Sequence, residues 1–467
     1  MKTFLRILLL VVVATATAIA IFYAWTDWAG ARHWKAVEAD LRAKGEPLSV
    51  AEFIPKPIPD EMNFAAAPIF AEVQKDSDGT KWRISQIKGF KGGYRKGSTQ
   101  LASAARSVDP KFSGSDAEAA RVILTQMDRW KPLLDEVREA AQRPGTDWKL
   151  DYSTPYHMRV DYLTILLNLS QAFSTEAKAY IEIGDSAAAL ADFDFILGLS
   201  ERTVGPPLLI GHFVRMSLIG MGIDVLKYGI DRHAWTELQL KAIQRTLAHI
   251  SLQPELINSL RLERTFFNDA FLDSTRVGVE AFFSLSEESA PRDKALARIF
   301  WALRPAGWSN EDRCAYSEGL QSIIDDVTSA PLTLRMESSQ PHGIVAIILH
   351  LWRTPFTAIA LPSEEGAIKN TFWHQSLVNE ACTACAIERY RLAHGMLPPD
   401  LNALCPEFLT AVPLDPMSGQ PLHYKPGQGD SYILYGVGWN QKDDGGSEQG
   451  GRSSEAIDWV WKIGNPS

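Results

Sequence analysis

The chain has 467 residues, which is enough for two to four domains at roughly 150 residues per domain. Its 47 basic and 56 acidic residues give a formal net charge of −9, so nothing favours nucleic acid as a partner, and we expect none. Hydrophobic residues at 46% and charged residues at 22% are close to globular averages, which argues against a disordered or fibrous chain.

The first strong signal is a run of 20 uncharged, mostly apolar residues from Ile7 to Thr26. A helix of that length, rising about 1.5 Å per residue, crosses a hydrocarbon core of about 30 Å. Lys2 and Arg6 precede the run, and Trp25 and Trp28 lie where the helix would leave the bilayer. The sequence therefore predicts an N-terminal transmembrane helix, residues 1–28, that acts as a signal-anchor.

Two features of this segment leave alternatives open. Ala14, Ala16 and Ala18 resemble the cleavage site of a signal peptide, but the apolar run continues well past them. More basic residues follow the run than precede it, which favours a cytoplasmic body. A short basic leader is nevertheless the usual signal-anchor arrangement, and long domains translocate largely regardless of charge. We predict a single-pass protein of the cell inner membrane with its body facing the periplasm.

Residues 29–114 contain Pro47, Pro55, Pro57 and Pro59 and show little periodicity. Because proline removes a backbone donor and restricts its neighbour, this stretch predicts an irregular connector.

Residues 115–362 have helical periodicity and predict an irregular helical-hairpin body. Expected helices cover 117–142, 158–183, 187–199, 207–227, 236–250, 255–275 and 310–327. The stretch from Ala177 to Phe193 resembles the junction of a tetratricopeptide-type hairpin, but it does not recur at a 34-residue period. The apolar segment at 206–226 holds His212, Arg215 and Asp224, so it predicts a buried core helix and not a second membrane span.

Glu263 lies on the same helical face as Leu256, Leu260 and Phe267, so we expect it to be largely buried. A buried carboxylate needs a partner, and we expect an ion pair with Arg215. The alternative is a catalytic acid.

Cys382 and Cys385 form a Cys-x-x-Cys inside a helical pattern and not at a helix N-terminus. We expect two small apolar side chains on a packed helix face, with a redox pair as the alternative. The sequence contains neither the H-E-x-x-H nor the G-x-S-x-G motif.

Residues 363–467 predict a small α+β unit. A helix at 363–394 precedes three strand-like runs at 422–425, 432–437 and 457–463, and Pro426 to Asp430 marks a hairpin turn between the first two. The overall fold class is therefore mainly α, ending in a three-stranded antiparallel sheet.

Several motifs in this tail occur together in one order. They are Ala386-Ile-Glu-Arg-Tyr390-Arg-Leu-Ala-His-Gly395-Met-Leu-Pro398, Pro413-Leu-Asp415-Pro416 with Gly419 and Pro421, Tyr432-x-x-Tyr435-x-Val437-Gly438, and Asp443-Asp444-Gly445-Gly446. With these motifs, about 90 of the 467 residues resemble the globular half of the major pseudopilin of type II secretion systems.

The pseudopilin-like resemblance implies a long helix carrying a small antiparallel sheet, and a calcium ion bound in the loop before the last strand. Asn440, Asp443, Asp444 and Asp458 occupy the corresponding positions. Asn440 stands where the family often has Asp, and the loop is longer than usual. The apolar segment lies more than 300 residues upstream and lacks the family's glutamate, so we do not expect the chain to polymerise as a pilin.

The whole layout is similar to that of membrane-anchored bacterial envelope proteins of unknown function. We expect a scaffold or adaptor without catalytic activity, with other envelope proteins as partners and a link to a secretion or pilus-like system. The alternatives are an envelope hydrolase using a cleft in the helical body and a structural pseudopilin-like subunit. A cleft holding carboxylates and histidines without partners would favour the enzyme, whereas a groove lined with exposed apolar residues would favour the adaptor.

Overall fold

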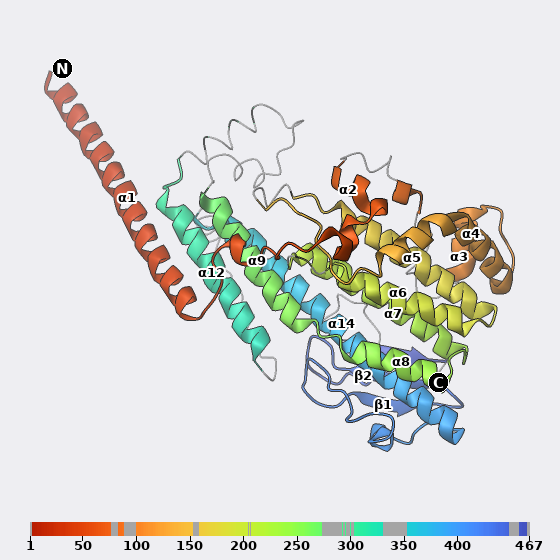
Figure 1. Ribbon diagram of the computed structural model, residues 1–467. Helices are drawn as coiled ribbons and strands as arrows, with labels where there is room; N and C mark the ends of the chain where they lie inside the picture. Colours follow the sequence, from red (N-terminus) through yellow and green to blue (C-terminus); the bar gives the residue numbers. More distant parts are fainter. Residues whose placement is uncertain are drawn as a thin grey trace. The chain divides into compact units, whose positions relative to one another are not determined.

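The computed structural model describes residues 2–75, 83–87, 100–152, 158–203, 207–272, 303–329, 353–447 and 457–464, together with Gly205, Arg292, Ala295 and Ile299. The fold is mainly helical, with a long apolar N-terminal helix and a C-terminal three-stranded antiparallel sheet, as the sequence predicts (Figure 1).

The chain forms two compact units. One consists of Met1–Phe53, Ile257–Ser329 and Thr333–Ala367, and we call it the α1 unit. The other contains Ile54–Leu256 and Ile368–Ser467, and we call it the sheet unit. Each is described by itself below.

Helix α1 runs without interruption from Lys2 to Ala43. None of its most apolar 18-residue window is buried, whereas 67% of the corresponding window of α7 (Leu209–Asp231) is buried. Both helices are long and apolar enough to cross a membrane, but α7 is a core helix, which agrees with the prediction. Helix α1 passes the expected boundary at residue 28 because residues 29–43 contain no proline and consist mostly of good helix formers.

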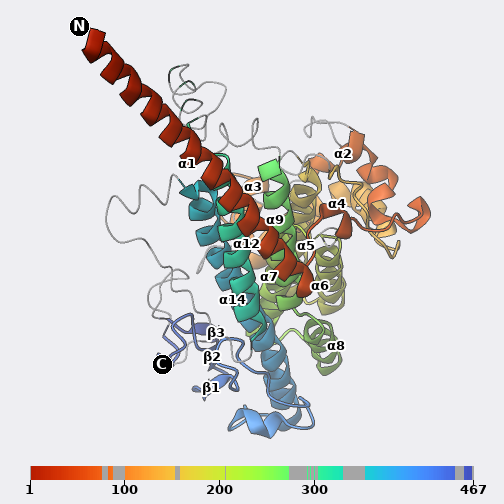
Figure 2. The same cartoon turned by 90° about the vertical axis from the view of Figure 1, so that its left-hand side faces the viewer.

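Within the α1 unit, the second half of α1 packs against α12 (Gly307–Thr328), and Figure 2 shows the two helices crossing. The backbones meet at a pair of glycines: a Cβ on Gly307 would lie 2.0 Å from the Thr26 carbonyl oxygen, and one on Gly30 would lie 2.3 Å from the Gly307 carbonyl oxygen. The Gly307 N–H donates to Asp27 Oδ1 at 2.6 Å. Further along, Val37, Leu41 and Cys314 form a small apolar cluster.

The predicted helices of the body are confirmed with small shifts at their ends. They are α4 (Asp116–Ala140), α5 (Asp161–Glu182), α6 (Ser186–Glu201), α7, α8 (Glu237–Ala248) and α9 (Gln253–Leu272). Ser115 caps α4, and its capping box with Glu118 satisfies backbone donors at the helix start. Gly184, at φ +83°, turns the chain between α5 and α6, and Asp185 caps α6. Helices α5, α6 and α7 pack on one another around one large core.

The predicted connector at 29–114 is only partly irregular. After α1, its described residues form short 3-10 turns and two helices: η1 (Val50–Glu52), η2 (Asp60–Met62), η3 (Phe64–Ala66), η4 (Pro68–Phe70), α2 (Ala71–Lys75), η5 (Arg83–Gln86) and α3 (Gln100–Val108). Asn63 fixes the turns to the body, since its side chain donates to the Asp147 carbonyl at 2.8 Å and accepts the Asp147 N–H at 2.8 Å. Phe64 and Phe70 are fully buried against Trp148. The connector is therefore packed in its second half, because its apolar residues join the core.

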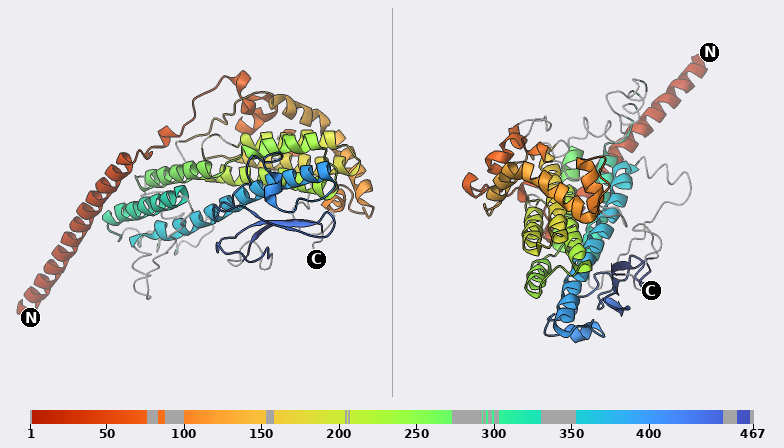
Figure 3. Two further views of the ribbon diagram at one scale, coloured as in Figure 1. Left: turned by 90° about the horizontal axis from the view of Figure 1, so that it is seen from below. Right: turned by 90° about the vertical axis from the view of Figure 1, so that its right-hand side faces the viewer.

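The tail begins with α14 (Pro355–His394) and the 3-10 turn η7 (Leu401–Leu404), followed by β1 (His423–Pro426), β2 (Tyr432–Gly436) and β3 (Trp459–Ile463). The sheet order is β1-β2-β3 and both pairings are antiparallel, with Tyr424 opposite Leu434 and Leu434 opposite Trp461. Both views in Figure 3 place the strands beside the C-terminal half of α14, and Tyr432, Leu434 and Trp461 belong to the same core as Ala381 and Cys385.

Candidate functional site

The loop between β2 and β3 brings the four predicted calcium ligands into one hydrogen-bonded turn. Asp458 is only 3% exposed, and its two carboxylate oxygens accept the N–H groups of Asp444 at 3.2 Å and Gly446 at 2.7 Å. Asn440 Nδ2 donates to Asp444 Oδ2 at 2.8 Å. Asp443 Oδ1 accepts the Gly445 N–H at 2.8 Å and the Tyr435 hydroxyl at 3.1 Å. Residues 448–456 of this loop lie outside the described part of the chain.

Every one of these carboxylates already accepts a donor from the protein. Burial raises the pKa of Asp458, although its two backbone hydrogen bonds oppose that shift. Among the described residues, no group of three or more His, Cys, Asp or Glu side chains is placed to hold a metal ion. Calcium at this loop stays a prediction.

The predicted ion pair between Glu263 and Arg215 is wrong. Arg215 Nη1 instead pairs with Glu255, and Nη2 donates to Glu201 at 2.5 Å. Glu263 is half-buried and lies two turns beyond Glu255 on α9. The periodicity of α9 identifies an apolar face, but the sequence does not show at which height along it the arginine of another helix lies.

Arg215 belongs to a buried polar chain within the sheet unit. His212 Nε2 lies 2.9 Å from Thr371 Oγ1, and His212 Nδ1 lies 3.5 Å from Glu255 Oε2. The order hydroxyl, imidazole, carboxylate is that of a nucleophile, its base and an orienting acid. However, His212 and Thr371 are each 1% exposed, and neither lines the two pockets described below. We therefore interpret this chain as a polar link between α7, α9 and α14.

The two cysteines of the Cys-x-x-Cys lie buried on α14, as predicted for a packed helix face. Burial raises the pKa of the Cys382 thiol to about 12 and that of Cys385 well above its usual range. Both thiols are therefore protonated at neutral pH and act as small apolar groups.

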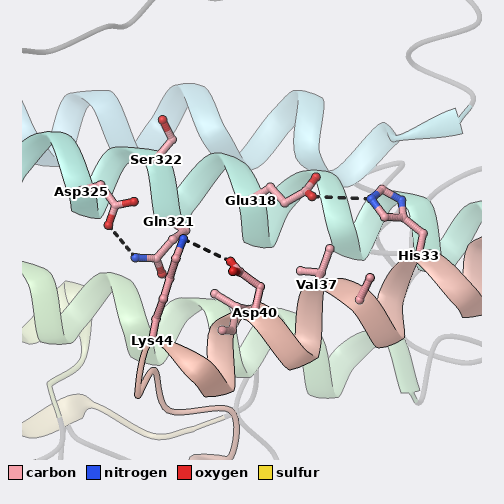
Figure 4. Close-up of a pocket in the computed structure, with 10 residues that line it drawn as sticks. His33, Val37, Asp40, Lys44, Glu318, Gln321, Ser322 and Asp325 are labelled. Carbon is pink, nitrogen blue, oxygen red and sulfur yellow. Dashed lines mark hydrogen bonds and ion pairs between the residues drawn. The ribbon is translucent and has the colours of Figure 1, made fainter.

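A first pocket, of about 490 Å³, lies between α1 and α12 in the α1 unit (Figure 4). Its charged and polar side chains pair with one another. Lys44 Nζ lies 3.1 Å from Asp40 Oδ2, and His33 Nε2 lies 3.5 Å from Glu318 Oε1. Gln321 donates to Asp325 at 2.8 Å. Because these lining groups pair with one another, few of their hydrogen-bond donors and acceptors are left to bind a ligand.

A second pocket, which we call the α4–α6 groove, has a volume of about 460 Å³ and lies in the sheet unit. It is lined by Arg138, Ala141 and Gln142 at the end of α4, by Tyr180 of α5, and by Ala188, Ala191, Asp192 and Phe195 of α6. The capped hairpin of α5 and α6 fixes the relative register of Tyr180 and Asp192.

Two buried carboxyl groups lie side by side at the groove. Asp192 is 4% exposed and Glu176, on α5, is 5% exposed. Arg138 Nη2 approaches both without close contact, at 3.5 Å from Glu176 Oε2 and 3.6 Å from Asp192 Oδ1. The two carboxyl groups hydrogen-bond to one another, and Tyr180 hydrogen-bonds to Glu176. The individual oxygens Glu176 Oε2 and Asp192 Oδ2 have no hydrogen-bond partner among the described residues.

The electrostatics of the pair follow from this geometry. Burial raises the pKa of Glu176, and the charge of Arg138 offsets part of that effect. Burial also raises the pKa of Asp192, and the neighbouring Glu176 charge raises it further. At least one of the two groups is therefore prone to hold a proton well above the usual carboxyl range.

The sequence analysis did not single out this pair. Glu176 lies beside Phe173, Ala177 and Tyr180 on the expected helix at 158–183, so the helical-face criterion that predicts burial of Glu263 also applies to Glu176. The sequence gives no comparable indication for Asp192, because its neighbour Glu176 belongs to the preceding helix of the hairpin.

Comparisons with protein-family models, with curated proteins and with solved structures found no match to this chain. The site therefore rests on its geometry alone.

Proposed function

We propose that the protein is a membrane-anchored scaffold or adaptor that holds a partner protein in the α4–α6 groove. The observation that carries this proposal is the groove itself, with its small and aromatic lining residues. Its volume of about 460 Å³ lies within the range of roughly 300–1,000 Å³ that is common for ligand sites.

The anchor in this proposal is the apolar part of α1. Its side chains are exposed over the first two dozen residues, with Phe4, Leu10 and Ile21 each more than 60% exposed. Such a surface is unfavourable in water and matches a hydrocarbon environment. We place the helix in the inner membrane and the two units in the periplasm.

The tail adds a link to a secretion or pilus-like system, on the strength of its resemblance to the major pseudopilin. A helix beside a three-stranded antiparallel sheet is compatible with that resemblance. In this proposal the partners are other envelope proteins, and calcium in the loop with Asp458 stiffens the tail.

Site-specific photo-cross-linking in membranes tests the adaptor role. A photoreactive amino acid at Ala188 should cross-link to a distinct protein, because Ala188 lines the groove. The same group at Leu238 of α8, which is 76% exposed, is the matched control. The purified partner should then bind the full chain in detergent micelles. Equal cross-linking at both positions, or no binding by the purified partner, would contradict the proposal.

Topology is tested separately by adding protease to intact spheroplasts. Digestion of the two units with survival of the apolar part of α1 is expected. Protection of the units would overturn the orientation, and recovery of the chain in the soluble periplasmic fraction would overturn the anchor.

A hydrolase is the second candidate, and the carboxyl pair is the observation that favours it. Two neighbouring carboxyls with raised pKa values suit acid–base chemistry. None of the residues lining the groove is a histidine, and its apolar lining suits binding. Turnover of a cell-wall or peptide substrate that is lost in Glu176→Gln would favour the enzyme over the adaptor.

A further inference from the structure

We propose that the α4–α6 groove binds a lysine-type ammonium group, held between Glu176 and Asp192. This inference rests on the proposed function and names the chemistry by which the groove recognises its partner.

The first argument is unmet hydrogen bonding. Glu176 Oε2 and Asp192 Oδ2 are buried acceptors without a partner among the described residues, and Asp192 lines the groove directly. Buried acceptors are almost always satisfied, so one unsatisfied oxygen on each carboxyl beside a pocket indicates a missing donor. An ammonium group offers three N–H donors from one atom and can serve both oxygens together.

The second argument is charge. Arg138 supplies one positive charge for two carboxyl groups, and in the empty groove one of them is prone to hold a proton. An ammonium group supplies the second positive charge and lets both carboxyls ionise. Arg138 is unable to close on the pair, since its guanidinium stacks over the Phe173 ring at 4.9 Å and stays at least 3.5 Å from each carboxylate. One monovalent cation balances the site, whereas a divalent metal would find only two carboxylates and a neighbouring positive charge.

The third argument is the lining. The small side chains of Ala188 and Ala191 leave space on one side of the groove, and Tyr180 and Phe195 supply aromatic surface. Such walls suit the aliphatic stem of a lysine, whose methylenes pack on apolar surface while the charged end reaches a carboxylate. The same chemistry has two sources, a lysine side chain of a polypeptide and a free alkylamine.

Titration calorimetry on the full chain in detergent micelles tests the proposal with four probes. These are n-pentylamine, its neutral analogue 1-pentanol, a short alanine-rich peptide with one central lysine, and the same peptide with that lysine Nε-acetylated. We expect the two charged probes to bind and the two neutral probes to show at least about tenfold weaker binding. Tighter binding of the lysine peptide than of pentylamine identifies a polypeptide ligand, and equal binding identifies a free amine.

Variants locate the binding. Asp192→Asn should weaken amine binding at least tenfold, while Asp194→Asn, an exposed aspartate on the same helix, should leave it unchanged. Ala188→Trp should also abolish binding by filling the groove without touching the acids. Circular dichroism melts confirm that each variant is folded.

Equal affinity of charged and neutral probes, or equal amine binding by the parent and a folded Asp192→Asn variant, would overturn the proposal. A specific cross-link at Ala188 without amine binding would remove this inference and leave the adaptor role standing. Amine binding without a cross-linked protein would support this inference and remove the adaptor role.

Discussion

Two buried acidic sites in this protein have opposite electrostatic characters. In the α1 unit, Glu46 binds Arg261 at 2.7 and 2.9 Å and Arg264 at 2.6 Å. In the sheet unit, Glu176 and Asp192 share one guanidinium that stays 3.5 to 3.6 Å away. Burial alone would raise the pKa of Glu46, but the hydrogen bonds from both arginines outweigh it and lower that pKa. The pKa values of Glu176 and Asp192 are raised.

The difference shows that burial by itself does not identify a functional carboxylate. The side chain of Glu46 is as buried as that of Asp192, at 5% and 6% exposed, yet its oxygens are saturated by partners and its role is structural. The pair at the groove combines burial, unsatisfied oxygens and access to a pocket. It is this combination that points to a ligand.

The largest expected effect is at Glu46. Glu46→Gln leaves the fully buried Arg264 without its counter-charge and should cost about 3–5 kcal/mol in the α1 unit. Hydrogen exchange of the α12 amides measures that local free energy. Glu38→Gln, which breaks an exposed pair with Arg42, is the control and should cost less than about 1 kcal/mol. Similar losses in the two variants would contradict the contrast drawn here.

Glu364 extends the comparison within the α1 unit. Burial, followed by the charge of Glu263, raises its pKa from 4.5 to about 8. Because the folded state holds the proton more tightly than the unfolded state, stability should fall as pH rises from about 4.5 through about 8. The total loss is on the order of 3 kcal/mol, at about 1.4 kcal/mol for each factor of ten in proton affinity and discounted for partial hydration. Glu364→Gln should remove this slope in α12 exchange, and the adjacent Glu365→Gln should retain it.

A third kind of acidic site is the loop with Asp458, whose carboxylate accepts backbone N–H groups. Calcium at a hundredfold excess over its Kd should stabilise the tail by about 2.7 kcal/mol. Exchange of the β2 and β3 amides with millimolar calcium and then with a chelator measures this gain, and Asp443→Asn with Asp444→Asn should abolish it. Unchanged exchange in the parent would show that the backbone N–H groups fully occupy this loop.

The smallest expected effect is at Asp192. Because its pKa is raised, a rising pH ionises the pair and destabilises the fold around α6. Asp192→Asn should therefore flatten the fall in α6 stability that occurs as the pH rises, and the charge of Arg138 keeps this effect small. An unchanged pH dependence of stability would mean that the pair is ionised over the whole pH range measured. The pair would then be a buried, ionised site of the same kind as Glu46.

Much of the fold follows from local sequence patterns. Ser115 and Gly184 mark helix ends through chemistry that is visible in the sequence, and the runs around Leu434 and Trp461 alternate as strands do. Pairings between helices do not follow in the same way. Arg215 pairs with Glu255 and not with Glu263, because the choice depends on how far one helix is shifted along another.

The candidate site was beyond sequence analysis for the same reason. Glu176 and Asp192 belong to different helices, and their proximity to Arg138 of a third helix depends on the angle of packing. Only their apolar surroundings were accessible from the sequence. The four residues of the β2–β3 loop were easier to identify, since they lie within one short segment of the chain.

If α1 is the membrane anchor that we propose, its unbroken course determines how far the protein reaches from the bilayer. Its 42 residues span about 63 Å, of which about 30 Å would be embedded. Flexible tethers let a domain explore a radius that grows with the square root of their length. Here the crossing at Gly30 and Gly307 begins within two turns of the end of the apolar run. The α1 unit would therefore be held at a fixed distance from the membrane surface. Any protein that binds this unit would have to do so close to that surface.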